Sequence, residues 1–298
     1  MTTAMTGTDT GLPLPSGSRV GIVAGGGRLP AEVADKLRSR GHEPFVVVAE
    51  GETDPAGELE KHDHVSLPLE RFGSLVPVLK RHRVSHLVLA GEIKRRPKLT
   101  RLRPSAGLLA MLPSLAALLA RGDDGLLRGV VRYIEKRGIK VVGAHEIVPE
   151  LLADEGLMTT ASPTGSDWRD IEAARIAAET IGALDIGQGA VAIGGRAIAL
   201  EGIEGTDGLL ERVKGMRDHG RLAGKTRGVL VKCAKPGQEV RADLPAIGLR
   251  TVELAHAAGL AGIGVEAGHT LVLEGPPMIA RANALGMFVI GIPPKDET

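Results

Sequence analysis

The stretch Arg19-Val-Gly-Ile-Val-Ala24, followed at once by Gly25-Gly-Gly-Arg-Leu-Pro30, decides how the first half of the chain is interpreted. The five residues after Arg19 are apolar, three of them β-branched, and predict a strand. Val33, Ala34 and Leu37 then recur at helical spacing, and Pro30 suits the first turn of a helix, where its missing N–H costs nothing. Glycines between a strand and a helix let the backbone approach a ligand, and N–H groups at a helix N-terminus bind phosphate. We therefore predict a nucleotide-binding strand–loop–helix unit, with a plain tight turn as the alternative.

The glycines match the dinucleotide-binding fingerprint only in part. Gly25-x-Gly27 is present, but Pro30 stands where the third glycine belongs. Glu50 follows the predicted strand Pro44–Ala49, in the position of an acid that binds a ribose. A nicotinamide-dependent oxidoreductase is therefore one alternative function.

The rest of the first half repeats the same alternation of strands and helices. A strand at His64–Leu67, a helix at Arg71–His82 and a strand at Ser85–Leu89 predict a parallel, doubly wound sheet. The 298 residues favour two domains, because a single core stops growing near 250–300 residues. We predict an α/β protein with an N-terminal Rossmann-like parallel sheet and a C-terminal α/β domain with its own sheet. The predicted parts are a disordered leader at 1–18, a nucleotide-binding domain at 19–148, a linker at 149–167 and a metal- and lipid-substrate domain at 168–298.

Composition and charge exclude several classes of protein. Aromatic residues make up 2% of the chain and the net charge is +1, which disfavours nucleic acid as a partner. Cys233 is the single cysteine, so the chain has no internal disulfide and no cysteine-rich metal site. No apolar run reaches the length of a membrane span, and the apolar helix pattern at Gly107–Ala120 indicates core, or contact with lipid or a partner subunit. If this apolar stretch contacts lipid, a non-catalytic lipid or nucleotide carrier is a second alternative function.

The loop Lys232–Gly248 is the strongest candidate for chemistry. A strand at Gly228–Cys233 leads into it, a helix at Leu249–Ala258 leaves it, and Pro236 and Pro245 restrict its conformations. Lysines, an arginine and acids lie together here at the C-terminal end of a strand, where open α/β sheets place ligands. We expect the loop to bind an anionic substrate and a divalent cation, with a solvated connector as the alternative.

Acids follow strand ends or open helices throughout the second domain, and two more acids open a helix in the first. Oxygen ligands without histidine or cysteine clusters suit Mg²⁺ held together with a substrate phosphate. Asp123 and Asp124 equally suit helix capping. The acids of the second domain are Asp185, Glu204, Asp207, Glu239, Asp243 and Glu266.

Several motifs together resemble one family, the UDP-2,3-diacylglucosamine pyrophosphatases of lipid A biosynthesis found in Gram-negative bacteria. The resemblance covers nearly everything after residue 18, with the motifs in matching order in both domains. The motifs are Gly21–Pro30, Arg121-Gly-Asp-Asp124 with Arg128, Gly143–Glu146, Leu184–Gly189, Glu204–Asp207, Lys235-Pro-x-Gln238 and Asp243-Leu-Pro-x-Ile-Gly248.

The resemblance implies a cytoplasmic enzyme that is peripheral to the inner membrane. It implies Mg²⁺-dependent cleavage of UDP-2,3-diacylglucosamine to UMP and 2,3-diacylglucosamine 1-phosphate, with water attacking the UMP-side phosphorus. We also expect a homodimer. The chain departs from the family after the fourth strand, where Glu92 stands for an asparagine and one extra residue precedes Pro97.

The site residues predicted on this basis fall into three groups. The catalytic residues are Asp243, Lys235 and Arg241. The metal ligands are drawn from Asp243, Asp207, Asp123 and Asp124. The residues that bind substrate are Gly25, Gly26, Gly27, Leu29, Pro30, Gly91, Arg95, Gln188, Thr206 and Lys232.

Overall fold

The computed structural model describes residues 14–15, 17–52, 56–95, 122–222, 224–225 and 227–294. Most of the predicted leader and the apolar stretch Gly107–Ala120 lie outside these ranges. So do the basic residues Arg96, Lys98, Arg101 and Arg103. Contacts between Cα atoms divide the chain into two compact units near residue 150.

The first unit is built on one parallel sheet with the strand order β3-β2-β1-β4-β5. This confirms the predicted Rossmann-like sheet. The strand order reverses between β1 and β4, so the loops after these two strands mark the ligand-binding crevice of such folds. The strands are β1 Val20–Ala24, β2 Phe45–Ala49, β3 Asp63–Leu67, β4 His86–Ala90 and β5 Lys140–Val141.

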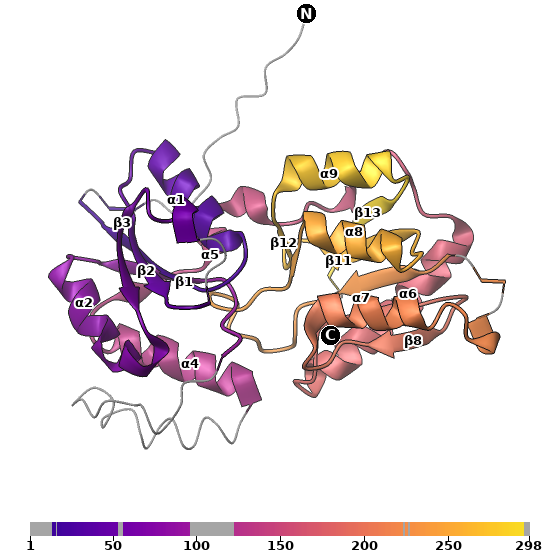
Figure 1. The fold of residues 1–298 in the computed structure, drawn as a ribbon, viewed down its shortest axis with the longest axis horizontal. Coiled ribbons are helices and arrows are strands. Elements are labelled where there is room, and N and C mark those ends of the chain that lie inside the picture. Colours follow the sequence, from indigo (N-terminus) through magenta and orange to yellow (C-terminus); the bar gives the residue numbers. More distant parts are fainter. Residues whose placement is uncertain are drawn as a thin grey trace, which may run out of the picture. The chain divides into compact units, whose positions relative to one another are not determined.

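Strands β1 and β2 are buried along their whole length, because helices cover both faces of this sheet. Figure 1 shows α1 and α5 on one side of the strands and α2 and α4 on the other. Pro30 lies in the first turn of α1, as predicted. The helices are α1 Leu29–Ser39, α2 Leu75–Arg81, α4 Gly122–Glu135 and α5 Ala144–Ile147, with 3₁₀ turns at Ala56–Glu58, Leu69–Ser74 and Pro149–Leu151.

The second unit has its own mixed sheet, with the order β6-β13-β11-β9-β7-β8. The central strands β9, β11 and β13 are parallel, whereas β6, β7 and β8 run antiparallel to their neighbours. A separate parallel pair joins β10 to β12. The strands are β6 Gly156–Leu157, β7 Gly189–Ala192, β8 Ala197–Leu200, β9 Val229–Lys232, β10 Ala246–Ile247, β11 Gly262–Glu266, β12 Leu271–Val272 and β13 Phe288–Ile292.

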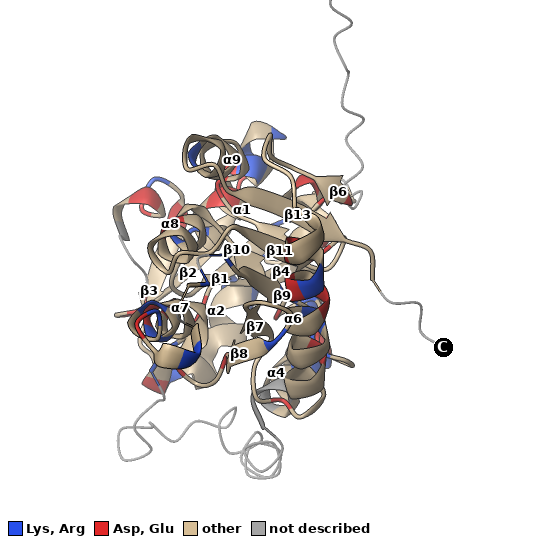
Figure 2. Ribbon diagram, turned by 90° about the vertical axis from the view of Figure 1, so that its right-hand side faces the viewer, with Lys and Arg blue, Asp and Glu red and all other residues tan. Residues whose placement is uncertain are grey.

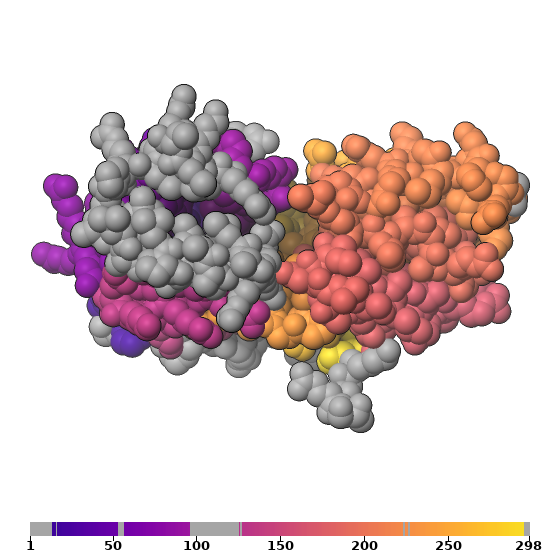
Figure 3. Space-filling view, turned by 90° about the horizontal axis from the view of Figure 1, so that it is seen from below, coloured from indigo at the N-terminus to yellow at the C-terminus, as the bar shows by residue number. Residues whose placement is uncertain are grey.

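Strand β9 shows how this sheet forms two cores. Val229 and Val231 pack in a cluster with α6, while Leu230 points to the other face and packs with α7, α8 and α9. All three side chains are fully buried. Figure 3 shows the outer face that α6, α7 and their neighbours present to solvent, in pink to orange. The helices are α6 Gly165–Ala183, α7 Gly205–Gly215, α8 Leu249–Ala257 and α9 Gly275–Ala284.

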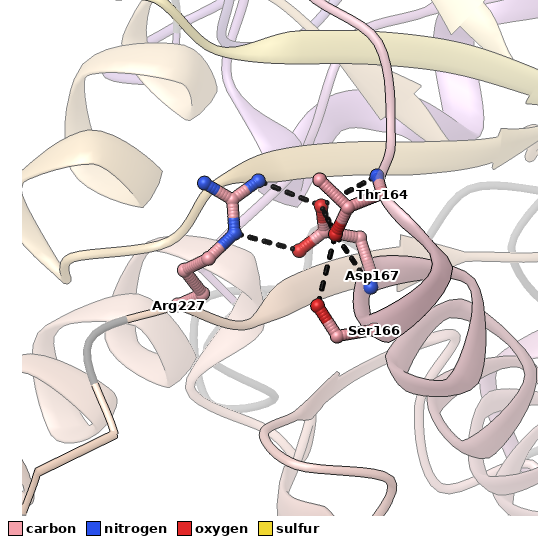
Figure 4. Close-up of polar contacts among 4 residues, drawn as sticks. All are labelled: Thr164, Ser166, Asp167 and Arg227. Atoms are coloured by element: carbon pink, nitrogen blue, oxygen red, sulfur yellow. Dashed lines mark hydrogen bonds and ion pairs between the residues drawn. The ribbon is translucent and has the colours of Figure 1, made fainter.

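Helix α6 begins at Gly165, inside the predicted linker, because a capping box fixes its first turn. The backbone N–H and the hydroxyl of Thr164 both donate to the Asp167 carboxylate, and Arg227 binds the same carboxylate through two nitrogens (Figure 4). Acidic and basic residues are interspersed along the helix (Figure 2). Part of the predicted linker at 149–167 therefore belongs to the second unit, since β6 also pairs with β13.

Helix α7 begins at Gly205, with Glu204 at the N-cap. Thr206 lies inside the first turn, and its hydroxyl donates to the carboxylate of Glu201.

Candidate active site

The candidate site lies at one edge of the second sheet, where the C-terminal ends of β9 and β11 meet the start of β7. Lys232, the last residue of β9, is the register partner of both Val265 in β11 and Gly189 in β7. Loops that are distant in sequence therefore converge here: 184–188 before β7, 201–204 after β8 and 233–245 after β9. All of the candidate residues of the second unit lie in or beside these loops.

The loop after β9 is held in shape by its own hydrogen bonds. The backbone N–H of Lys235 donates to the Gln238 side-chain oxygen at 2.9 Å, and the N–H of Gln238 returns to the carbonyl of Lys235 at 3.2 Å. Further along, the N–H groups of Ala242 and Asp243 both donate to the Glu239 carbonyl. Together with its two prolines, these bonds give the loop a defined conformation.

Two ion pairs tie the charged residues of this loop. Lys235 Nζ lies 2.9 Å from Asp185 Oδ1, and both side chains are largely buried. Arg241 binds both carboxylate oxygens of Glu239, at 2.7 and 2.9 Å. The two cations predicted to be catalytic, Lys235 and Arg241, are thus each bound by an acid, Asp185 and Glu239, from the set of possible metal ligands.

A buried chain of hydrogen bonds joins three of the predicted substrate-binding residues. Lys232 Nζ donates to the Thr206 hydroxyl oxygen at 2.7 Å, and that hydroxyl donates to Glu201 Oε1 at 2.8 Å. The other carboxylate oxygen of Glu201 accepts the backbone N–H of Gln188 at 3.2 Å. Glu201 is not among the site residues predicted from sequence, although its position directly after a strand was the available signal.

Asp243 is half-buried on the same loop. Its backbone is fixed through Glu239, while its carboxylate makes no hydrogen bond or ion pair with any residue that the structure describes. Two side-chain amides near the end of β9 also have an unpaired atom. Gln188 Oε1 and Gln238 Nε2 are buried and have no hydrogen-bond partner in the described ranges. A carboxylate, an amide oxygen and an amide N–H are therefore left for a ligand.

The metal ligands proposed from sequence do not form a ready-made site in the described part of the chain. No three histidine, cysteine or acidic side chains there are close enough to hold a metal ion. Asp207 is half-exposed and accepts from Arg250 Nε at 2.6 Å. Asp123 and Asp124 fall in the first turn of α4, but their side chains lie outside what is described. This arrangement still fits Mg²⁺, which is commonly held by one or two carboxylates and the phosphates of the substrate.

The glycine loop of the first unit is packed against the loop after β4. The N–H of Gly25 donates to the Ala90 carbonyl at 2.8 Å, and Gly26 and Glu92 exchange backbone hydrogen bonds. Gly91 has a φ of +85°, and a Cβ there would lie 2.4 Å from the Gly26 carbonyl oxygen. The N–H groups of Gly25 and Gly26, predicted to face a phosphate, are thus engaged by protein, which leaves ligand contact to Gly27 and the start of α1 at Leu29 and Pro30.

Arg95 is also held by protein contacts. Its Nε donates to Glu52 Oε1 at 2.8 Å, and its terminal nitrogen donates to the Glu50 carbonyl oxygen. Burial alone would raise the pKa of Glu52, but the hydrogen bonds from Arg95 and from the Lys94 backbone outweigh it and lower the pKa. The Arg95 side chain keeps 61% of its surface exposed, so it can still contact a ligand from this position.

Comparison with known proteins accounts for both units. The LpxI N-terminal domain family matches residues 19–151, and the LpxI C-terminal domain family matches residues 154–290. This chain belongs to the LpxI family. It is 39% identical over 280 residues to the UDP-2,3-diacylglucosamine pyrophosphatase LpxI of Caulobacter vibrioides, covering 94% of this chain and 99% of that protein. The resemblance drawn from the LpxI motifs is thus confirmed across both domains.

Proposed function

We propose that this chain hydrolyses the pyrophosphate bond of UDP-2,3-diacylglucosamine to give UMP and 2,3-diacylglucosamine 1-phosphate. The observation that carries the proposal is full-length similarity to a protein named for that substrate. The geometry agrees with it, because Lys232, Lys235, Arg241 and Asp243 come together within one short loop and its preceding strand. Hydrolysis of a diphosphate needs cations near the phosphates and an acid that orients water or a metal ion.

The proposed reaction is an in-line attack by water on the UMP-side phosphorus. The new P–O bond comes from water, and the bond from this phosphorus to the bridging oxygen breaks. The electron pair stays on the bridging oxygen, which leaves as part of 2,3-diacylglucosamine 1-phosphate. Asp243 orients the water or holds the metal ion, and Lys235 and Arg241 stabilise the charge that grows on the leaving phosphate.

Mg²⁺ is part of this proposal. Asp243 is the ligand that the geometry favours, because its carboxylate is half-buried and unpaired among the described residues. Asp207, Asp123 and Asp124 remain further candidates, and use of Asp207 requires its contact with Arg250 to open. When bound, the ion supplies positive charge to the phosphate oxygens.

Exposed aliphatic side chains at the same edge of the sheet support a lipid substrate. Leu184, Ile186, Ile203 and Val240 are at least 41% exposed and belong to the loops that carry the candidate residues, and the exposed Leu200 ends β8 beside them. Burying a CH₂ group of an acyl chain against such side chains contributes about 0.8 kcal/mol. None of the described helices could span a membrane. We propose that the protein acts in the cytoplasm at the surface of the inner membrane, as a homodimer.

Incubation of the protein with UDP-2,3-diacylglucosamine in ¹⁸O-labelled water tests the reaction and its site of attack. We expect release of UMP that carries the label, and loss of at least 100-fold in rate when EDTA replaces Mg²⁺. Mass spectra of both products give the position of the label. UDP-N-acetylglucosamine, which lacks the long acyl chains, serves as the control and should be cleaved far more slowly. Label on the glucosamine phosphate would contradict the proposed site of attack, and no UMP from the lipid substrate would contradict the function itself.

A further inference from the structure

Glu201 is a buried acid at the candidate site whose place in the fold is tightly defined. It directly follows β8, its backbone N–H donates to the Gly189 carbonyl at 2.8 Å, and the residue is only 6% exposed. Its carbonyl oxygen is packed against Gly187, where a Cβ would approach it to 2.3 Å. The backbone around Glu201 therefore leaves its carboxylate little freedom to move.

Both carboxylate oxygens of Glu201 accept hydrogen bonds, one from the Thr206 hydroxyl and one from the Gln188 N–H. A hydroxyl has a single proton. The Lys232 ammonium can only donate, so the Thr206 oxygen accepts from Lys232 Nζ at 2.7 Å and the hydroxyl proton is left for another acceptor. Glu201 is that acceptor, and it fixes the rotation of the hydroxyl so that the oxygen lone pairs face Lys232.

Lys232 is a buried cation whose charge is balanced indirectly. It is 5% exposed and makes no ion pair with any residue in the described ranges. Its ammonium donates to Thr206 and to the Ala246 carbonyl at 3.0 Å, which accounts for two of its three protons. Ala246 follows the Asp243–Pro245 segment directly, so the ammonium is anchored to the backbone three residues after the proposed catalytic acid.

We propose that Glu201 is a positioning residue for the pyrophosphatase reaction. It orients the Thr206 hydroxyl so that the Lys232 ammonium is held in place, and the third ammonium proton binds a phosphate oxygen of the substrate. Glu201 itself touches no reacting atom. This inference rests on the proposed function and adds to it a residue that acts through Thr206 and Lys232.

The variant Glu201→Gln tests the role with minimal change in shape. An amide has one acceptor oxygen where the carboxylate has two, so either Thr206 or Gln188 must face an N–H₂ group. We expect kcat for UMP release to fall about 10- to 100-fold, with KM changed less than threefold. Thr206→Val should lower kcat at least as much. The double variant should be no worse than Thr206→Val within threefold, because Glu201 acts through that hydroxyl.

Glu211→Gln is the matched control. Glu211 lies on α7, five residues after Thr206, and its side chain is exposed, so the kcat of this variant should stay within twofold of the wild type. A Glu201→Gln protein with wild-type kcat would overturn the proposal, as would full additivity with Thr206→Val. If Glu201→Gln does not fold, Glu201→Asp replaces it, which keeps the charge but shortens the reach. The same loss of kcat is then expected, and full activity refutes the role. A wild-type protein that releases no UMP refutes the proposed function instead.

Discussion

Replacement of Asp243 by alanine should lower kcat for UMP release by about 10³-fold while the melting temperature changes by less than about 2 °C. The loss follows from the proposed role, since a group that orients water or holds a metal ion at a growing negative charge is worth about 10²–10³ in rate, and more when both roles coincide. The fold should survive because the Asp243 carboxylate makes no hydrogen bond or ion pair with a described residue that the substitution would break. Its backbone N–H bond to Glu239 is kept in the variant.

Two further variants make this result specific. Asp243→Asn keeps the shape of the side chain and removes its charge, so it should be nearly as inactive as Asp243→Ala if the charge is what matters. Asp218→Ala removes an exposed acid beyond the end of α7 and should keep the wild-type rate. Rates are measured as UMP release at saturating substrate and Mg²⁺, with thermal unfolding in parallel. An Asp243→Ala protein that retains more than a tenth of wild-type kcat would remove Asp243 from the mechanism.

Asp207→Ala then separates the metal candidates. Asp207 and Arg250 form an exposed pair, which typically contributes less than about 1 kcal/mol to stability. A rate loss restored by raised Mg²⁺ would therefore indicate a metal ligand, whereas an unchanged Mg²⁺ dependence would leave Asp207 as a surface residue.

The elements of the fold were predictable wherever one local pattern determined them. The β7–β8 hairpin is an example, because Gly194 and Gly195 adopt positive φ values of +65° and +75°, as a two-residue hairpin turn requires. Strand β9 is another, since its valines and leucine are buried on both faces of the sheet. The start of α6 is set by the local capping box of Thr164 and Asp167, but the ion pair that holds Asp167 was not predictable, because Arg227 lies 60 residues away.

The candidate site was predictable in position but not in its contacts. Sequence places Lys235 and Asp243 on one loop, yet only the folded sheet brings Asp185 to Lys235 across 50 residues. The glycines show the same limit. Gly25 and Gly91 were interpreted as room for a ligand, whereas the structure uses the missing side chains to let two loops of the protein touch. A sequence pattern cannot tell these two uses of glycine apart.

Replacement of Asp167 by asparagine should lower the free energy of unfolding by about 3 kcal/mol. The Asp167 side chain is fully buried and binds Arg227 through both oxygens, and it also accepts the N–H and hydroxyl of Thr164. Breaking a buried ion pair costs about 3–5 kcal/mol, and we take the lower end because Arg227 is half-exposed. Denaturant unfolding at pH 7 measures the difference, and activity at low temperature should persist because the residue lies at the N-terminus of α6, away from the loops of the candidate site.

The pH dependence of this effect has a definite sign. Burial alone would raise the pKa of Asp167, but the hydrogen bonds from Arg227 and Thr164 outweigh it and lower the pKa below its ordinary value. The unfolded chain then binds more protons than the folded protein near pH 4, so the contribution of Asp167 is present above that pH and is lost as the pH falls through the folded pKa. The stability difference between wild type and Asp167→Asn should therefore shrink on acidification from pH 5 to pH 3.

Asp170 provides a matched control on the same helix, because its pKa is shifted in the opposite direction. Burial raises its pKa, against the opposing hydrogen bond from the Gly195 N–H, with Asp167 adding repulsion and Lys225 and Arg169 attraction. The folded protein therefore holds the Asp170 proton more tightly than the unfolded chain, and ionisation of Asp170 destabilises the fold as the pH rises. As the pH rises from 3 to 6, the stability of Asp170→Asn relative to wild type should increase, whereas the stability of Asp167→Asn relative to wild type should decrease. Parallel curves for the two variants would show that the Arg227 contact does not hold the Asp167 carboxylate in its charged form.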